Sequence, residues 1–467
     1  MKRVRLHTLW FPPLGLWLLW RNREVRWPRK VLGTVGIALY SIVYAVVVIG
    51  LLLLAGMQWE FRGGMLPYLT FRKTLPNYDA VEANRRAHNQ PREDARPAAR
   101  ESYWTGFRGP NRDGHYAQGP ITTQPRLLWK QPIGGGYASF ACGEGRAFTI
   151  EQRRQNEVAT AYDIESGREL WAHDWPGEFV EALGGDGPRA TPAYDEGRVY
   201  FMGAFGELRC LSASDGKLLW RKPHGVTLTY GASASPLVVD EKLIVVADDI
   251  IAYDKRSGAQ IWKFTGEKPA YSSPMRVTLN GQPQVLVVGK TRAMGLSIDH
   301  GKLLWEFPWV VLQGNRNIAQ PLILSSNRFF LSAGYGTGCA AVEITTSGAR
   351  EVWRNKNLKN KFTSSVLWQN HIYGLDEDIL VCLDAQTGER NWKDGRYGYG
   401  QLLLANGLLV ILCGDGDLAL VKATPDSHQE IVRMHAIEGK TWNQPALEYG
   451  KLLVRNAVEM ACFQIGQ

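Results

Sequence analysis

The stretch Val381-Cys382-Leu383-Asp384-Ala385-Gln386-Thr387-Gly388-Glu389-Arg390-Asn391-Trp392 decides the fold. Its core is an Asp, a Gly four residues later and a Trp four residues after the Gly. An Asp side chain caps a turn by accepting hydrogen bonds from nearby backbone N–H groups, and Gly supplies the positive φ that such a turn needs. The phrase therefore predicts a hairpin whose second strand carries the Trp.

This phrase recurs at a nearly constant interval. Copies run Asp163-Gly167-Trp171, Ser212-Gly216-Trp220, Asp254-Gly258-Trp262 and Ser297-Gly301-Trp305, with a stretched copy at Glu343, Gly348 and Trp353. If Trp129 is included, successive Trp residues up to Trp392 are 42, 49, 42, 43, 48 and 39 residues apart. A period of that size predicts one four-stranded sheet per repeat, as in the blades of a β-propeller. Seven Trp residues are expected to pack between blades: Trp129, Trp171, Trp220, Trp262, Trp305, Trp353 and Trp392.

The number of blades follows from the end of the chain. Residues 429–434 occupy a seventh, degenerate repeat without Gly or Trp, and Cys462 stands where Cys210 and Cys382 stand in their repeats, ten residues before a Trp. The chain ends at Gln467, before that Trp position is reached. Leu127 to Pro132 is therefore expected to supply the last outer strand, which would close the ring and remove exposed sheet edges. We predict an all-β, eight-bladed propeller, with seven blades as the alternative.

Composition agrees with many short strands and excludes several other classes of protein. The 467 residues include 49 Gly and 17 Trp, and the six Cys form no Cys-x-x-Cys motif and no adjacent pair. These features argue against a helical bundle, a zinc ribbon and a disulfide scaffold. The nine His form no metal-binding motif, so no metal site is expected.

A single long apolar segment precedes the repeats. Val31 to Met57 contains 27 residues without a charge, enough for a helix to cross a bilayer. Residues 1–30 carry eight basic side chains and only Glu24, a net charge of +7 out of +9 for the chain. The positive-inside rule then places residues 1–30 in the cytoplasm and the carboxy-terminal domain in the periplasm of a bacterium, with a single pass through the inner membrane. A cleaved signal peptide is the competing interpretation, although this apolar segment is long for one. Because most of the net positive charge lies in residues 1–30, where it specifies the orientation of the membrane segment, nucleic-acid binding is not expected.

The chain therefore divides into four predicted segments. They are a basic cytoplasmic segment at residues 1–30, a transmembrane helix at 31–57, a flexible periplasmic linker at 58–103 and a propeller at 104–467. The linker prediction rests on its polar composition, which is rich in Arg, Pro and Ala.

The repeats resemble those of the pyrroloquinoline-quinone-dehydrogenase-type propeller family, with its Ala-x-Asp-x-x-Thr-Gly-x-x-x-Trp core. Residues 104–114, Trp-Thr-Gly-Phe-Arg-Gly-Pro-Asn-Arg-Asp-Gly, also resemble the Arg-Gly-Pro-x-Arg-x-Gly opening of bacterial envelope proteins of this class. The family contains quinone-dependent alcohol and sugar dehydrogenases. It also contains non-enzymatic propellers such as the β-propeller subunit of the outer-membrane barrel-assembly machinery. The resemblance implies the fold over residues 104–467 and leaves both kinds of function open.

The residues that the dehydrogenases use are not recognisable in this chain. Resemblance to those enzymes would imply an adjacent Cys pair under the quinone, a Ca²⁺ site of Glu, Asn and Asp oxygens, and an Asp base. The Cys pair is absent. Acidic residues expected near the loops between blades follow no motif: Glu178, Glu181, Asp186, Glu267, Asp394 and Glu438. We therefore expect no cofactor, with pyrroloquinoline quinone and calcium as the alternative.

The connections between blades carry the strongest functional signal. Tyr, Trp and Arg are the residues that protein interfaces favour, and several of them fall in these connections on one face of the predicted ring. The predicted partner-binding residues are Tyr230, Tyr271, Arg316, Asn317, Arg396, Tyr397 and Trp442. Ordinary solvated loops are the competing interpretation. The expected function is a membrane-anchored scaffold that docks other envelope proteins on this face. The alternatives are a membrane-tethered, quinone-dependent oxidoreductase and a sensor of a small ligand in the central channel.

Overall fold

The computed structural model describes residues 11–61, 63–64, 67–71, 75–88, 101–226, 228–312, 314 and 316–466. The chain forms two compact units, Met1–Lys73 and Thr74–Gln467. The predicted cytoplasmic segment lies partly outside the described residues, because residues 1–10 are not among them.

The first unit contains a helical hairpin made of α2 (Pro12–Arg21) and α3 (Trp27–Leu54). Leu19 of α2 packs against Gly33 of α3, where an added Cβ would lie 2.7 Å from Leu19 Cδ2. Trp20 Nε1 donates a hydrogen bond of 3.0 Å to Thr34 Oγ1. Helix α3 has 28 residues and a mean hydropathy of 2.7, so by length and composition it could cross a membrane, as could an amino-terminal signal sequence. It begins four residues before the predicted span of 31–57 and ends three residues earlier.

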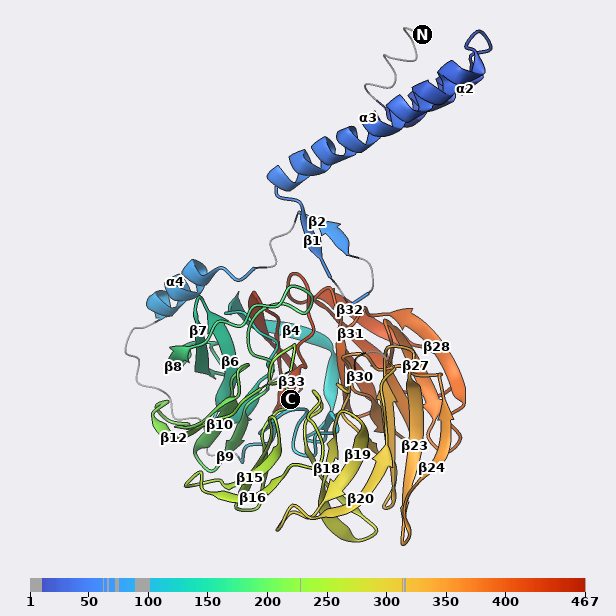
Figure 1. The fold of residues 1–467 in the computed structure, drawn as a ribbon. Helices are drawn as coiled ribbons and strands as arrows, with labels where there is room; N and C mark the ends of the chain where they lie inside the picture. Colours follow the sequence, from blue (N-terminus) through green and yellow to red (C-terminus); the bar gives the residue numbers. More distant parts are fainter. Residues whose placement is uncertain are drawn as a thin grey trace. The chain divides into compact units, whose positions relative to one another are not determined.

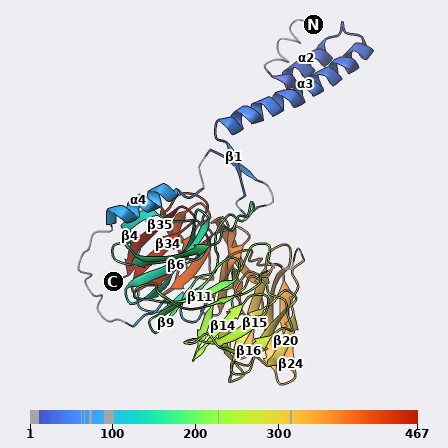
Figure 2. The same ribbon diagram turned by 60° about the vertical axis from the view of Figure 1, so that its left-hand side comes forward.

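The predicted linker contains regular structure. A hairpin of β1 (Gln58–Glu60) and β2 (Tyr68–Thr70) belongs to the first unit, and α4 (Tyr78–His88) belongs to the second. Helix α4 lies beside the outermost strand of the last blade (Figure 2). Arg85 Nε lies 2.9 Å from Glu169 Oε1, and Asn84 donates to Gln131. The prediction of a flexible linker is therefore wrong over α4, because the polar composition that suggested flexibility supplies pairing groups for the propeller surface. Residues 89–100 of the predicted linker lie outside the described residues.

Eight sheets of the second unit form a ring, which confirms the predicted eight-bladed propeller (Figure 1). Each blade runs from an innermost to an outermost strand. Blade 1 contains β5 (Ala141–Gly143), β6 (Arg146–Arg153), β7 (Asn156–Asp163) and β8 (Glu169–Pro176), and blade 2 contains β9 (Ala193–Asp195), β10 (Arg198–Met202), β11 (Glu207–Ser212) and β12 (Leu218–Pro223). Blade 3 contains β13 (Leu237–Val239), β14 (Lys242–Val246), β15 (Ile250–Asp254) and β16 (Gln260–Phe264), and blade 4 contains β17 (Met275–Leu279), β18 (Gln282–Val288), β19 (Arg292–Leu296) and β20 (Leu303–Pro308).

The second half of the ring follows the same plan. Blade 5 contains β21 (Leu322–Ile323), β22 (Arg328–Ala333), β23 (Gly338–Thr345) and β24 (Gly348–Asn355), and blade 6 contains β25 (Val366–Trp368), β26 (His371–Asp376), β27 (Ile379–Asp384) and β28 (Arg390–Arg396). Blade 7 contains β29 (Gln401–Ala405), β30 (Leu408–Leu412), β31 (Asp417–Lys422) and β32 (Glu430–His435). Blade 8 contains β33 (Ala446–Glu448), β34 (Lys451–Arg455), β35 (Glu459–Gly466) and β4 (Ile121–Pro132).

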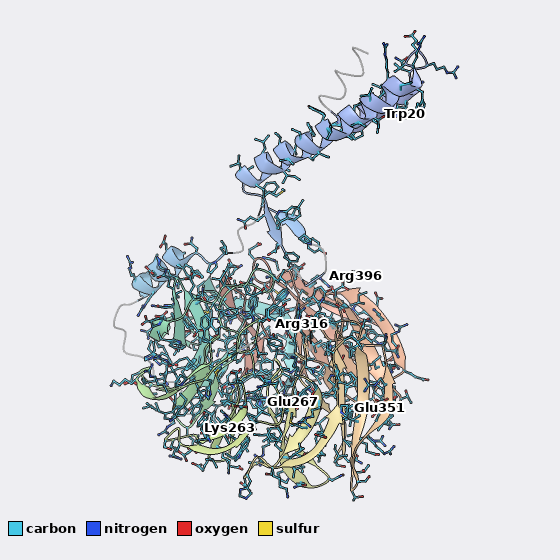
Figure 3. All side chains as sticks on the ribbon, viewed as in Figure 1. Trp20, Lys263, Glu267, Arg316, Glu351 and Arg396 are labelled. Carbon is cyan, nitrogen blue, oxygen red and sulfur yellow. The ribbon has the colours of Figure 1, made fainter. Side chains whose placement is uncertain are left out.

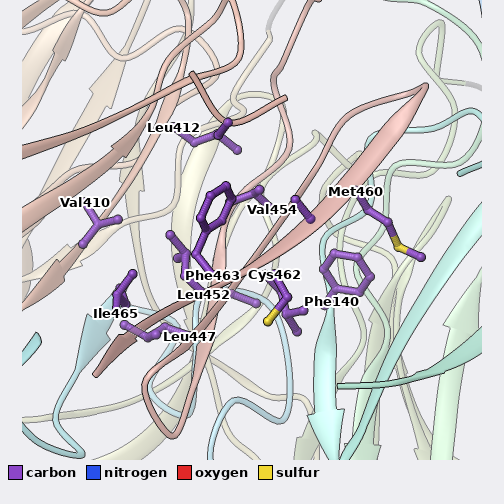
Figure 4. Packing of buried hydrophobic residues seen from close by; sticks show 14 of the residues in the cluster. Phe140, Val410, Leu412, Leu447, Leu452, Val454, Met460, Cys462, Phe463 and Ile465 are labelled. Atoms are coloured by element: carbon purple, nitrogen blue, oxygen red, sulfur yellow. The ribbon is translucent and has the colours of Figure 1, made fainter. Parts of the chain in front are cut away.

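Blade 8 closes the ring with strands from both ends of the propeller sequence. Strand β4 pairs antiparallel with β35, and Trp129 lies opposite Cys462, as the repeat arithmetic predicts. Side chains between blades 7 and 8, among them Val410, Leu412 and Phe463, belong to one cluster of buried hydrophobic residues (Figure 4). Because the two middle strands of each blade face neighbouring blades on both sides, their residues are buried in continuous apolar runs such as Leu243 to Val246.

Each repeated phrase joins one blade to the next. Trp129 Nε1 donates a hydrogen bond of 2.8 Å to the carbonyl of Ile164, which follows the capping residue Asp163 of blade 1. The same ring covers Gly167, where an added Cβ would lie 2.7 Å from Trp129 Cδ2. The same stacking of a Trp on the Gly of the following blade recurs for Trp171 on Gly216, Trp220 on Gly258, Trp262 on Gly301 and Trp353 on Gly388. Trp305 instead donates to Gln284 within its own blade, and Trp392 donates to the carbonyl of Thr424.

A segment ahead of β4 fills part of the central channel. This lead-in segment, residues 101–116, includes β3 (His115–Tyr116), which pairs parallel with the innermost strand β29. The buried Arg108 donates to the carbonyls of Ser364 and Ser365, next to β25. The buried Arg112 donates to the carbonyls of Ser235, Pro236 and Pro274, next to β13 and β17. The Arg-Gly-Pro-x-Arg-x-Gly sequence is therefore a channel plug whose two guanidinium groups satisfy carbonyls of the inner strands.

Candidate docking face

Strand direction assigns the connections to two faces of the ring. Successive strands of a blade are antiparallel, so the loops between blades and the loops between the second and third strands lie on one face. We call this the docking face. The opposite face carries the Asp-Gly turns and the turns between the first and second strands.

Aromatic and cationic side chains from the inter-blade loops meet over the channel on the docking face. Arg316 lies over two rings, with its Cζ 5.3 Å from the ring centroids of both Tyr230 and Tyr335. Lys361 lies 5.0 Å from the ring centroids of Tyr335 and Tyr399. Tyr335 lies in the loop between β22 and β23 of blade 5, and the other four residues lie in connections between blades, so each contact joins two separate loops.

The series of contacts continues around the channel. The ring centroid of Phe362 lies 4.7 Å from that of Trp442, and the ring centroid of Trp442 lies 5.6 Å from that of Tyr137. Lys440 lies 4.4 Å above the Trp442 ring and donates a hydrogen bond of 3.0 Å to the Gly184 carbonyl. We call this group the collar; its members are Tyr137, Arg189, Tyr230, Tyr271, Arg316, Tyr335, Lys361, Phe362, Tyr399, Lys440 and Trp442. All eleven are half-buried.

Two collar groups show how burial sets the electrostatics of the channel mouth. Arg189 lies 5.3 Å over Tyr137 and donates to the carbonyls of Gly185 and Gly187, and burial lowers its guanidinium pKa from the ordinary value. Burial also raises the pKa of the Tyr335 phenol. The Tyr335 phenol therefore stays protonated at neutral pH.

Exposed apolar side chains lie in loops on the same face as the collar. Val180 and Leu183, 67% and 46% exposed, lie in the connection between β8 and β9, and Phe205, 52% exposed, lies between β10 and β11. Val310 and Leu312, 52% and 71% exposed, lie in the connection between β20 and β21. Large apolar groups that stay exposed next to aromatic and cationic ones are typical of protein-docking surfaces.

A buried carboxyl group holds one of these loops. Glu157, on β7, accepts hydrogen bonds from the Trp175 indole and from the backbone N–H of Ala204, next to Phe205. Glu157 is buried and has no ion pair with any described residue, so burial raises its pKa to about 7.

The structure divides the seven predicted partner-binding residues into three groups. Tyr230, Tyr271, Arg316 and Trp442 belong to the collar, and Arg316 is seen near the middle of the propeller in Figure 3. Arg396 is exposed farther out and pairs with Asp378. Asn317 and Tyr397 are buried and are corrections to the predicted set. Asn317 donates to carbonyls of Gly289 and Trp309, and the Tyr397 hydroxyl donates to Glu430, so both are structural.

Sequence reasoning missed several residues of this face. Tyr137 and Arg189 flank glycine-rich loops that give no periodic signal, and Phe362 follows two lysines in an ordinary polar stretch. Four of the five exposed apolar residues could have been suspected only from the length of two connections, residues 177–192 and 309–321, and Phe205 lies in the short loop between β10 and β11.

The described residues do not gather the groups that a quinone and calcium would need. All six Cys are free and buried, and burial raises the pKa of Cys210 and Cys462 to about 12. Within the described ranges, no three His, Cys, Asp or Glu side chains are arranged to hold a metal ion. Of the acids on this face, Glu267 is engaged by Thr291 and Arg292, and Glu181 by the amides of Leu183 and Gly184. The donor set therefore does not fit the site that the dehydrogenases would imply.

Comparisons with known proteins agree with this fold. Over residues 154–394, the chain matches the family model described as "Outer membrane protein assembly factor BamB". It is 24% identical over 304 residues to the protein of that name from Shewanella oneidensis, covering 58% of this chain and 71% of that protein. It is 21% identical over 369 residues to the one from Moranella endobia, covering 66% of this chain and 91% of that protein.

Solved structures of both functional groups share the fold. The BamB structure from Moraxella catarrhalis superimposes with a TM-score of 0.56 at 16% identity, covering 73% of this chain and 98% of that chain. The quinohemoprotein alcohol dehydrogenase from Comamonas testosteroni gives 0.59 at 11% identity, covering 84% and 85%. Structural likeness at these identities shows the propeller fold alone, whereas the sequence match extends over half of the chain. The chain belongs to the family of the outer membrane protein assembly factor BamB, a family of PQQ-type β-propellers.

Proposed function

We propose that this protein is a non-catalytic scaffold of the cell envelope that docks other proteins on the collar and the apolar side chains around it. The observation that carries the proposal is that ring of half-buried aromatic and cationic groups, flanked by exposed Val180, Phe205 and Leu312. Membership of the BamB family supports a partner from outer-membrane protein assembly.

The physical basis of the proposed docking is preorganisation. Tyr, Trp and Arg offer large contact areas with polar ends, and the cation–π contacts already hold them in place before a partner arrives. Less side-chain entropy is then lost on association. The apolar residues nearby supply surface whose burial drives binding.

We also propose that α3 anchors the protein in the inner membrane with the propeller in the periplasm. The apolar surface of α3 and the net charge of +7 on residues 1–30 support this orientation. An alkaline-phosphatase fusion placed after Gln58 should be active, and a cytoplasmic reporter at the same position should be silent. The opposite pair of results would reverse the topology.

Docking is tested by substitutions that change the face without reaching the blade cores. Phe205→Ser and Leu312→Ser remove exposed apolar groups, and Arg316→Ala removes a collar cation. Ile261→Ser is the matched control, because Ile261 is 45% exposed on the outer strand β16, away from the docking face.

Crosslinking in cells followed by purification and mass spectrometry would measure partner recovery. The three docking-face variants should lose a partner that the wild type and Ile261→Ser retain, while all variants keep the wild-type circular dichroism. Truncating a central anchor typically weakens an interface by about 2 kcal/mol or more, a loss of roughly 30-fold in affinity. If the docking-face variants recover the same partners as Ile261→Ser, this face is not the docking surface.

A further inference from the structure

The face opposite the collar contains a pocket of about 510 Å³ beside the lead-in segment. Its lining comes from Asn111, Asp113 and His115 of the lead-in, from Met275 to Thr278 of β17, and from the innermost strands β21 and β25. The volume is in the range of sites that bind small molecules or short peptides. The lead-in segment thus fills one part of the channel mouth and leaves the part next to blades 4 to 6 open.

Strand β17 presents an unusual inner edge to this pocket. The innermost strands of the eight blades have two or three residues, except β17 and β29, which have five. The inner edge of β29 is paired with β3, but β17 is hydrogen bonded to β18 alone. A strand edge of that length presents a row of N–H and C=O groups that can accept another strand.

Sequence register shows which groups of β17 face the channel. Thr278 lies opposite Pro283 of β18, and proline has no N–H to donate. This pair is therefore of the non-hydrogen-bonded kind, and pairs alternate along an antiparallel ladder. The backbone groups of Thr278 and Arg276 consequently point away from β18, toward the pocket, and no backbone group outside the sheets, among the described residues, pairs with their amides.

The pocket also contains a cation that is available to a ligand. The Arg276 side chain is exposed and makes no hydrogen bond or ion pair with any described residue. A guanidinium group matches a carboxylate through two parallel hydrogen bonds. Asp113 is the single acidic residue of the lining, and its Oδ1 accepts the His115 amide at 2.9 Å.

The inner end of the pocket favours a chain terminus over a continuous segment. Arg112 of the lead-in donates to the carbonyl of Pro274 at 2.9 Å, immediately before β17 begins. The lead-in therefore closes the channel at the start of β17, so a polypeptide that entered beside β17 would have to end there. A chain that enters with its carboxy-terminal end first runs toward the start of β17 and is therefore antiparallel to β17.

We propose that this pocket binds the carboxy-terminal end of another protein as an added antiparallel strand on β17, with its terminal carboxylate held by Arg276. Strand addition supplies main-chain hydrogen bonds, and capture of a terminal carboxylate supplies the specificity for a chain end. This site lies on the face opposite the collar and does not depend on the proposed docking function.

The test uses full-length protein in nanodiscs and a fluorescein-labelled peptide, Gly-Ser-Gly-Thr-Val-Thr-Val, with a free carboxyl end. Fluorescence anisotropy should show saturable binding of this probe. The carboxy-terminal amide of the same peptide should bind about tenfold more weakly or worse, because charge-assisted hydrogen bonds to the terminus are lost. Hydrogen exchange should slow at the amides of Arg276 and Thr278 when the free-acid peptide is bound.

Variants of the pocket separate charge from shape. Arg276→Gln should weaken binding of the free-acid peptide by about tenfold and leave binding of the amidated peptide unchanged. Asp113→Asn, which keeps the Oδ1 acceptor for His115, should strengthen free-acid binding because it removes a like charge. Arg390→Gln, an exposed arginine on the outer strand β28, is the matched control and should change nothing.

Three results would overturn the proposal: no binding of the free-acid peptide, equal affinity for acid and amide, or binding without protection of the β17 amides. Tighter binding of an amidated peptide carrying an internal Asp would also overturn it, because the recognised carboxylate would then be a side chain. Arg276 is exposed, so loss of folding does not confuse the Arg276→Gln result, and its melting temperature should equal that of Arg390→Gln.

Discussion

The contact between Trp262 and Gly301 allows the seam between blades 3 and 4 to be tested by a double-mutant cycle. Gly301 has φ +65°, and the Trp262 ring lies directly over it, so that an added Cβ would be 2.7 Å from Cδ2. Trp262 is 7% exposed and its Nε1 donates to the Ile298 carbonyl at 2.8 Å. The substitutions are Gly301→Ala, Trp262→Ala and their combination.

Each substitution has a separate physical cost. Trp262→Ala should reduce the free energy of unfolding by about 3–5 kcal/mol, as is usual for a buried aromatic truncated to Ala. Gly301→Ala should cost about 1–2 kcal/mol for a left-handed L-residue and about 1–3 kcal/mol more for the collision with the ring. In the double variant the ring is absent, so the collision disappears. The double variant should therefore be about 1–3 kcal/mol more stable than the sum of the single losses predicts.

Equilibrium denaturation of the full-length chain in detergent, followed by circular dichroism of the β-sheet, would measure these free energies. Gly281→Ala is the matched control, because Gly281 has φ +72° in a turn where an added Cβ meets nothing within 4 Å. Gly281→Ala should lower the free energy of unfolding only by the cost of placing an L-residue in the left-handed region, about 1–2 kcal/mol. Strict additivity of the cycle, or equal losses for Gly301→Ala and Gly281→Ala, would refute stacking of the indole on the glycine as the basis of the seam.

Three further predictions concern closure, pH and cofactor. Removing residues 1–100 should leave a folded propeller. Removing residues 1–132 should delete β4 and expose the edge of β35, so this truncation should aggregate in size-exclusion chromatography. Similar elution and melting of the two truncations would contradict closure by β4. Burial raises the pKa of Glu157 to about 7, so its carboxyl group stays protonated in the folded state up to about pH 7, whereas in the unfolded state it loses its proton near the ordinary pKa of 4.5. The contribution of Glu157 to the free energy of unfolding is therefore full below about pH 4.5 and is lost as the pH rises through 7. Glu157→Gln should flatten that part of the dependence of melting temperature on pH, and an unchanged slope would show that Glu157 is not responsible. Pyrroloquinoline quinone with Ca²⁺ should leave the melting temperature unchanged, because a ligand at 100 times its dissociation constant would add about 2.7 kcal/mol and be visible; a clear upward shift would restore the oxidoreductase alternative.

Residues close in sequence determined the predictable part of the fold. The phrase from Asp384 to Trp392 specifies a turn through its own hydrogen bonds, Asp384 accepting from the amides of Gln386 and Thr387, so the repeat could be recognised without distant contacts. Its period then determined the blade architecture, and the missing Trp after Cys462 indicated closure by β4. Helix α4 was missed because its order depends on partners such as Glu169, far along the chain.

The docking face shows where local reasoning ends. The sequence by itself indicated that Tyr, Arg and Trp lie in the inter-blade loops, but Tyr397 and Arg396 are adjacent in the chain, and only one of them is exposed. The tertiary structure decided that difference, since the Tyr397 hydroxyl meets Glu430 of the next blade and its ring joins the core. It also assembled the collar and the pocket beside β17 from loops and strands of many blades. Turn chemistry acts over a few residues and can be read from sequence, whereas a surface on the propeller axis exists only after ring closure brings separate repeats together.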